Sequence, residues 1–291
     1  DPLDFVLWKP KKEGEPFWKS PWCDGRPGWH IECSVMSKRY LGNTIDIHAG
    51  GEDLIFPHHE NEIAQSEAAN GVPFAHYLMH NGFLNIDNRK MSKSLGNFLL
   101  VREILKRYNP DVLRFFMLSA QYRSPLNYSE ELMESAKSGL ERIRTCGDRL
   151  KDLIANAPAE QMSEDEDSLL DTTKEYVTDF ENAMDDDFNT ADAIAAIFEL
   201  VKFANTKLDE DSSSEILMNV YQKIERLLGV LGLEFTVEKE DVDQQIRDLI
   251  EKRQQARKEK NFALADQIRD ELLAQGIELL DTREGVKWKR V

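Results

Sequence analysis

Apolar residues in the second half of the chain recur at helical spacing, and this pattern restricts the fold more than any other feature. Between residues 132 and 231, four successive segments carry apolar residues three, four or seven positions apart. Such spacing gives each helix one apolar face. Four such faces are most simply buried against one another, so the sequence predicts an antiparallel bundle. The acidic joint at residues 164–167 and the polar run at 209–214 are its expected connections.

The first part of the chain has the order of an α/β fold. It opens with about 45 residues rich in Trp, Pro and Gly, a composition typical of loops around a site. Alternating apolar residues, glycine pairs and helical patterns then follow one another. The expected elements are a helix over 27–41, a strand over 44–48, a tight turn at Gly50 and Gly51, a helix over 57–69 and a strand over 76–84.

A small α+β domain is predicted at the end of the chain. Residues 234–241 carry several charges and few apolar anchors, which indicates a linker. Two helices are expected over 242–259 and 262–273, and Gly276 would cap the second. Apolar residues on both sides of the turn at 281–285 predict a β-hairpin.

Composition limits the class of protein. The 291 residues suffice for two or three packing units, and no apolar run approaches the roughly 18 residues of a membrane span. We therefore expect no membrane partner and a cytoplasmic location. Three widely spaced cysteines do not indicate a disulfide framework. The net charge of −17 argues against a strong general attraction to nucleic acid, but residues 241–291 hold eleven acids and eleven bases and leave a local basic face open.

The segment Lys90-Met91-Ser92-Lys93-Ser94 is the first chemical motif. Two ammonium groups with small hydroxyl residues between them can grip a triphosphate and neutralise the charge that builds as pyrophosphate leaves. A solvated Lys/Ser turn is the alternative for an arbitrary basic pentapeptide. This pentapeptide, however, is identical to the second signature of the class I aminoacyl-tRNA synthetases.

A second motif combines Cys33, His58 and Glu62. His58 and Glu62 are four residues apart, so a helix would present both on one face. A thiolate from the preceding helix would complete a set of ligands that suits Zn²⁺. A surface His/Glu pair and a buried apolar cysteine are the alternative.

The sequence around these residues closely resembles the cysteinyl-tRNA synthetase family. The resemblance rests on Gly28-Trp29-His30-Ile31-Glu32-Cys33-Ser34, on the run from Ile47 to Ser66 and on Met184-Asp185-Asp186-Asp187-Phe188-Asn189-Thr190. It continues through residues 265–270 to Trp288, in the order of the family. By resemblance, Cys33, His58 and Glu62 bind zinc, which takes the sulfur of substrate cysteine as a further ligand and so rejects serine.

The resemblance also assigns the other substrates. Trp29 and His48 would line the amino-acid pocket, with core packing beside the site as the alternative. ATP with Mg²⁺ would be bound by Gly50, Gly51, Asp53 and the residues Lys90, Met91, Ser92, Lys93 and Ser94, with Lys90 and Lys93 acting in catalysis. His30 and His59 receive no role beyond a structural hydrogen bond. Asp185 to Asp187 precede a helix start capped by Asn189 or Thr190.

The end domain resembles the anticodon-binding domain of that family. Arg257, Lys258, Arg269 and Trp288 offer phosphate-binding charge and an aromatic ring that can stack on a base of tRNA(Cys). Without the resemblance, the same residues would be interpreted as a solvated helix face with a packed Trp. We expect the protein to be a monomer.

These assignments divide the chain into four parts. Residues 1–97 are expected to be the second half of a Rossmann-type class I catalytic domain, with the zinc site and the Lys90–Ser94 loop. Residues 98–128 would connect this part to the helical bundle of 129–235, and 236–291 would form the small anticodon-binding domain.

One family signature is missing from the sequence. No His-x-Gly-His element occurs in the 291 residues, and neither does the upstream Cys ligand, so we expect the chain alone to be inactive and its zinc affinity to be weakened. Cys23 is one substitute for that thiolate.

Two other functions stay open, a ligase that joins cysteine to an amino-sugar inositol and a non-catalytic helical fragment that binds tRNA. The end domain argues against the first. For the second, the intact Lys90, Lys93, Cys33, His58 and Glu62 argue against a decayed paralogue, whereas the missing signature leaves a truncated fragment open.

Overall fold

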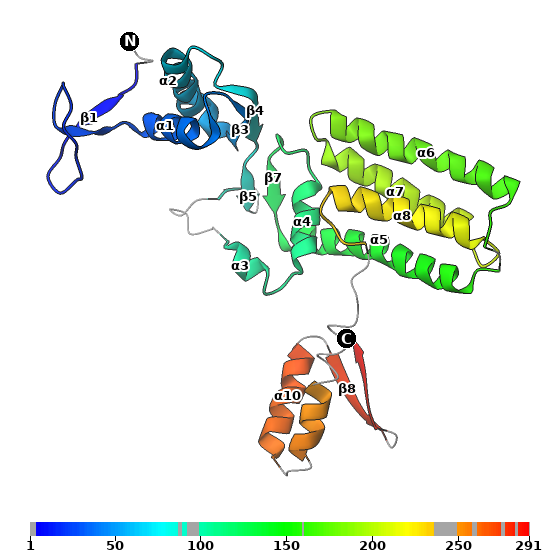
Figure 1. The fold of residues 1–291 in the computed structure, drawn as a ribbon. Helices are drawn as coiled ribbons and strands as arrows, with labels where there is room; N and C mark the ends of the chain where they lie inside the picture. The colour runs from blue at the N-terminus through cyan, green and yellow to red at the C-terminus, as the bar shows by residue number, and fades with distance from the viewer. Residues whose placement is uncertain are drawn as a thin grey trace. The chain divides into compact units, whose positions relative to one another are not determined.

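A computed structural model describes residues 4–86, 89–91, 99–158, 160–235, 249–257, 261–274, 277–282 and 285–290 (Figure 1). The chain divides into two compact units, Asp1–Phe235 and Thr236–Val291. No helix in the described ranges is both long enough and apolar enough to cross a membrane.

The first unit begins with a small α/β part that carries the predicted zinc residues. Two short antiparallel strands come first. A helix, a strand, a second helix and a further strand follow, and the strands on either side of the second helix pair in parallel. The elements are β1 Trp8–Pro10, β2 Gly25–Pro27, α1 Trp29–Leu41, β3 Ile45–Gly51, η1 Glu52–Leu54, η2 Ile55–His59, α2 Glu60–Asn70 and β4 Ala75–Asn81. The predicted strand–helix–strand order is confirmed.

Two predicted boundaries in this part are wrong. Gly50 and Gly51 do not form a tight turn, because both continue β3 and pair with His80 and Asn81 of β4. The second strand stops at Asn81 because Gly82 leaves the sheet, where its N–H donates to Tyr122 O. A Cβ at Gly82 would lie 2.6 Å from the Ser124 carbonyl carbon, so only glycine fits this close approach.

A connecting segment links the α/β part to the bundle. Its strand β5 pairs antiparallel with β6 and parallel with β7. The elements are β5 Leu84–Ile86, β6 Arg89–Lys90, α3 Val101–Ile104, α4 Pro110–Leu118 and β7 Leu126–Tyr128.

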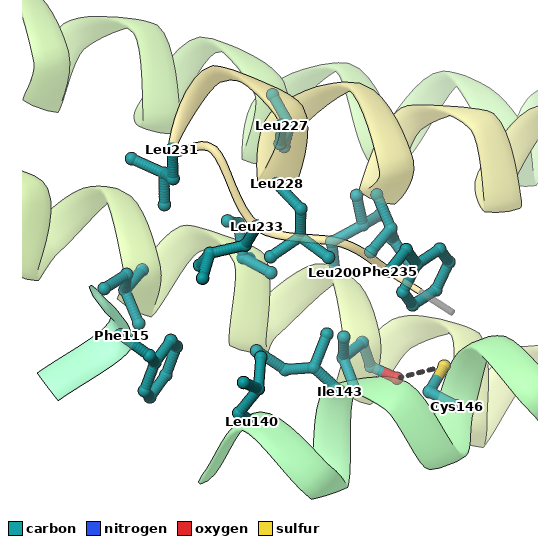
Figure 2. Close-up of a cluster of buried hydrophobic side chains, with 14 of the residues drawn as sticks. Phe115, Leu140, Ile143, Cys146, Leu200, Leu227, Leu228, Leu231, Leu233 and Phe235 are labelled. Carbon is teal, nitrogen blue, oxygen red and sulfur yellow. Dashed lines mark hydrogen bonds between the residues drawn. The ribbon is translucent and has the colours of Figure 1, made fainter. Parts of the chain in front are cut away.

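The predicted bundle is confirmed. It consists of α5 Glu130–Asn156, α6 Glu164–Asp185, α7 Thr190–Lys207 and α8 Ser214–Val230. Its core, shown in part in Figure 2, brings Leu140 and Ile143 of α5 together with Leu200 of α7 and Leu228 of α8. Asn189 caps α7 by accepting a hydrogen bond from Asp192 N–H, as the sequence predicts.

The second unit contains helical residues 249–257, α10 Phe262–Ala274 and a hairpin of β8 Ile277–Thr282 and β9 Gly285–Arg290. Ile250, Ile268, Leu272 and Ile277 form its small core. The predicted hairpin is confirmed, with Leu279 opposite Trp288.

Candidate metal centre and substrate site

Four elements of the α/β part meet at the candidate site. Cys33 lies in the second turn of α1, His48 on β3, His58 in the turn η2 and Glu62 in the first turn of α2. The predicted helix from Pro57 becomes a regular α-helix only at Glu60; the preceding η2 also contains Phe56, whose backbone angles are extended. His58 and Glu62 nevertheless lie together, with His58 Nε2 2.9 Å from Glu62 Oε1.

Cys33, His58 and Glu62 converge as the sequence predicts. One potential ligand atom from each lies within 4.8 Å of those of the other two. His58 is 6% exposed and Glu62 is fully buried, whereas Cys33 is partly exposed. A sulfur, an imidazole and a carboxylate therefore face one point at the edge of the fold, and this set of ligands suits Zn²⁺.

The hydrogen bonds of Glu62 indicate whether Cys33, His58 and Glu62 can accommodate a cation. Its Oε2 lies 2.6 Å from His48 Nε2, in a hydrogen bond. Its Oε1 is buried and has no hydrogen-bond partner, although His58 Nε2 is near. A buried carboxylate oxygen without a partner is costly, and a bound cation would remove that cost. The residues present therefore fit a metal ion.

The pKa values of the two acidic ligands, Cys33 and Glu62, are shifted in opposite directions. Burial, with help from Glu62, raises the pKa of the Cys33 thiol to about 11. Burial alone would also raise the pKa of Glu62, but the hydrogen bond from His48 and the nearby imidazoles outweigh it and lower that pKa. Glu62 is thus held as a carboxylate, which is the form that binds metals.

Trp29 and His48, the two residues predicted to line the amino-acid pocket, both contact the metal-ligand candidates. The Trp29 ring stacks on His58, with centroids 4.4 Å apart and planes at 29°. Trp29 also stacks on His30, with centroids 5.6 Å apart, and is 58% exposed. His48 reaches Glu62 directly through its Nε2. Both residues thus lie beside the metal-ligand candidates, and their place in an amino-acid pocket stays a prediction.

Further histidines surround Cys33, His58 and Glu62, and for His30 and His59 the sequence predicts only structural hydrogen bonds. His30 Nδ1 lies 2.8 Å from His58 Nδ1, and His59 Nδ1 lies 2.8 Å from His80 Nε2. Burial lowers the pKa of both His30 and His59, so each is held neutral. The predicted bonds are present. The contact of His30 with His58 could not be found from spacing, because it joins α1 to η2.

A second set of potential ligands, His48, His59 and Glu62, also lies within 4.8 Å. It shares Glu62 with the first set, so the carboxylate is common to both. Cys23, the suggested substitute for a missing thiolate, belongs to neither set among the described residues. It lies instead in a turn where its N–H donates to Ser20 Oγ.

The predicted nucleotide-binding glycines line the end of β3. A Cβ on Gly50 would lie 2.9 Å from His59 Cε1, and one on Gly51 would lie 2.6 Å from Asp53 Oδ1. Glycine therefore lets His59 and Asp53 approach the strand. The structure thus brings these residues to the same edge as the metal-ligand candidates.

Of the other predicted site residues, the structure describes some and not others. Lys90 ends β6, where it pairs with Asn85, and Met91 follows it. Ser92, Lys93, Ser94 and Lys258 lie outside the described ranges. Arg257 ends the helical residues 249–257, Trp288 lies on β9, and Arg269 is exposed on α10 within 3.8 Å of Asp266 and 3.7 Å of Asp270.

Comparison with known families gives two matches. Residues 1–138 match the family described as tRNA synthetases class I (C) catalytic domain, and residues 179–236 match the DALR domain. The first match contains the whole candidate metal centre. The second covers the end of α6 and the whole of α7 and α8.

Curated relatives match over the whole chain. Cysteine–tRNA ligase of Lachnospira eligens is 66% identical over 290 residues, and that of Lachnoclostridium phytofermentans is 60% identical over 296 residues. The chain is covered completely in both cases but spans only 61% and 63% of the relatives' length.

Solved structures support the fold. A leucyl-tRNA synthetase in a ternary complex from Agrobacterium radiobacter matches 73% of this chain and 32% of its own, with a TM-score of 0.58 at 18% identity. A putative arginyl-tRNA synthetase from Campylobacter jejuni matches 78% of this chain and 58% of its own, with a TM-score of 0.51 at 14% identity.

Proposed function

Since this chain belongs to the cysteine–tRNA ligase family of class I synthetases, we propose that it selects cysteine for ATP-dependent ligation to tRNA(Cys). The observation that carries this proposal is the meeting of Cys33, His58 and Glu62 within 4.8 Å. The orphaned Glu62 Oε1 supports it, because a buried carboxylate oxygen requires a partner.

Zn²⁺ is the proposed ion, held by Cys33, His58 and Glu62. When bound, it would supply a soft ligand position that favours the thiolate of cysteine over the hydroxyl of serine. Selection would then follow from ligand chemistry, whereas the shapes of cysteine and serine are too similar for a pocket to separate them well.

The surrounding residues hold these ligands in place. His48 fixes the orientation of the Glu62 carboxylate through the 2.6 Å hydrogen bond. Trp29 restrains the His58 ring by stacking, and its exposed indole forms a wall beside the site. Such supporting contacts set the geometry and affinity of metal sites.

ATP with Mg²⁺ is the proposed second substrate. Gly50 and Gly51, with Asp53, would let adenosine approach the backbone at the end of β3. Lys90 and Lys93, in the loop that includes Met91, Ser92 and Ser94, would stabilise the charge on departing pyrophosphate. The cysteine carboxylate would attack the α-phosphate to form the adenylate and release pyrophosphate. A tRNA hydroxyl would then attack the carbonyl carbon, take the cysteinyl group as an ester and release AMP.

Arg257, Lys258, Arg269 and Trp288 of the second unit are proposed to contact tRNA(Cys). Because the chain carries a net charge of −17, this binding would depend on local cations and would weaken as salt rises. We further propose that the protein acts as a monomer in the cytoplasm.

Calorimetric titration of the zinc-loaded chain with cysteine and with serine tests the proposal. We expect cysteine to bind and serine to bind at least about tenfold more weakly, a difference of roughly 1.4 kcal/mol. Removal of zinc, or Cys33→Ala, should abolish the preference, whereas Cys23→Ala should preserve it. Equal binding of the two amino acids, or cysteine binding indifferent to zinc, would refute the proposal.

A further inference from the structure

A groove between α6 and α8 of the bundle is lined by cations although the chain is strongly acidic. Its volume is about 540 Å³. The polar side chains that line it are Lys174, Thr178, Asn219, Gln222, Lys223 and Arg226. The chain has 54 acidic residues against 37 basic ones, yet no carboxylate is among the lining residues that the structure describes. The groove is therefore a local positive site.

Lys223 occupies this groove without an acidic partner. Its Nζ lies 2.6 Å from Thr173 Oγ1, and no carboxylate oxygen of a described residue lies within the 4.0 Å of an ion pair. Thr173 is fully buried, and its hydroxyl donates to Leu170 O at 2.6 Å. The hydroxyl thus accepts from Lys223, which anchors the ammonium group and leaves its other two N–H groups for a ligand.

Two further cations stand at the rim of the groove. Lys174 Nζ lies 2.7 Å from Asp171 Oδ1, and Arg226 Nη2 lies 3.3 Å from Glu181 Oε1. Both pairs are exposed and each contributes little to stability, so an anion in the groove can compete with Asp171 and Glu181 for these cations. Burial, together with repulsion from Lys174 and Arg226, outweighs the attraction of Asp171 and lowers the pKa of Lys223. An anion in the groove would compensate all three cations.

We propose that the α6–α8 groove binds a phosphate group, with Lys223 as the central donor and Lys174 and Arg226 at its edges. Lys and Arg are the usual ligands of phosphate oxygens, and Asn219, Gln222 and Thr178 add neutral hydrogen-bonding groups. The volume also admits part of an attached nucleoside. None of these residues belongs to the proposed cysteine, ATP or anticodon sites, so the inference goes beyond the proposed function.

The phosphate has two sources, free phosphate or a phosphodiester of RNA, and two binding arms distinguish them. In one arm, inorganic phosphate is titrated into the full chain while thermal unfolding is followed. In the other, a fluorescent single-stranded RNA oligonucleotide is titrated and its anisotropy is measured. Lys223→Met is compared with the wild type in both arms. Lys202→Met removes one cation from α7, where Lys202 pairs with Glu199, and is the matched control.

We expect Lys223→Met to weaken binding about ten- to a hundredfold, the range of a lost charge-assisted hydrogen bond. Lys202→Met and Lys223→Arg should bind like the wild type. Weaker binding by Lys223→Met in both arms, or in the RNA arm alone, would support a phosphodiester site. Weaker binding by this variant in the phosphate arm alone would support a small-anion site. No binding in either arm, or equal binding by Lys223→Met and the wild type, would overturn the proposal. Unfolding curves without ligand show whether Lys223→Met is folded.

Discussion

Glu62 Oε1 lies 2.9 Å from His58 Nε2 but accepts no hydrogen bond, although both side chains are buried. The other oxygen of the same carboxylate is bonded to His48. An asymmetric carboxylate of this kind, with a thiol beside it, is poorly satisfied by protein alone. A cation between Cys33, His58 and Glu62 accounts for this arrangement.

Glu62→Gln should lower the zinc affinity of the chain by more than about tenfold, because a neutral amide replaces an anionic ligand. Competition with a chromophoric chelator measures the affinity. Glu60→Gln changes an exposed acid in the same helix and should have no such effect. Wild-type affinity in Glu62→Gln would show that this carboxylate is not a ligand.

His48→Phe should weaken zinc binding about 10- to 100-fold, the usual effect of removing a group that orients a ligand. The ring remains, but the hydrogen bond to Glu62 Oε2 is lost. His76→Phe, at an exposed position on the neighbouring strand β4, is the control. The same competition assay applies, and equal affinities for His48→Phe and the wild type would remove His48 from the supporting contacts.

The sequence predicted the elements that depend on local pattern. The four bundle helices follow directly from apolar spacing, and the cap of α7 follows from Asn189. Cys33, His58 and Glu62 could be grouped because two of them are four residues apart, a thiolate suits the same metal, and a family resemblance supports the set.

Contacts between distant segments could not be predicted in the same way. Gly50 and Gly51 were expected in a turn because glycine usually marks one, whereas here it admits His59 and Asp53 to the end of a strand. The end of β4 depends on the approach of Gly82 to residues 122–124, some 40 positions further along the chain. The pairing of His30 with His58 likewise depends on how α1 packs on α2.

Two helical glycines should respond oppositely to alanine. A Cβ on Gly147 of α5 would lie 2.8 Å from Phe235 Cε2 in the core, whereas one on Gly229 of α8 would meet nothing within 4 Å. Gly147→Ala should lower the free energy of unfolding by about 1 kcal/mol, because overpacking exceeds the helix gain. Gly229→Ala should raise it by about 0.5 kcal/mol. Urea unfolding measures both, and a stabilised Gly147→Ala would contradict the packing of Phe235 shown in Figure 2.

Glu166 joins the starts of two bundle helices and should make stability depend on pH. Its carboxylate accepts from Ser163 N–H at 2.9 Å and from Ser213 N–H at 2.8 Å. Burial alone would raise its pKa, but these hydrogen bonds lower it below the ordinary value of 4.5. The stabilisation is therefore complete above pH 4.5 and is lost as pH falls through the lowered pKa.

Glu166→Gln should consequently cost about 1 kcal/mol of unfolding free energy near neutral pH, and less as the pH falls below that of the unfolded carboxyl group. Urea unfolding at several pH values measures the difference from the wild type. Glu164→Gln, in the same first turn, lacks these bonds and should cost less than about 0.5 kcal/mol. A difference for Glu166→Gln that grows as the pH falls would have the wrong sign for this account.

The absorption spectrum of the cobalt-substituted chain tests the central claim most directly, because a thiolate bound to cobalt gives a near-ultraviolet charge-transfer band. We predict this band for the wild type and for Cys23→Ser, and no such band for Cys33→Ser. Addition of cysteine to the wild type should increase the band, and addition of serine should not. A band that persists in Cys33→Ser, or a spectrum that cysteine leaves unchanged, would contradict a thiol-selecting metal centre at Cys33, His58 and Glu62.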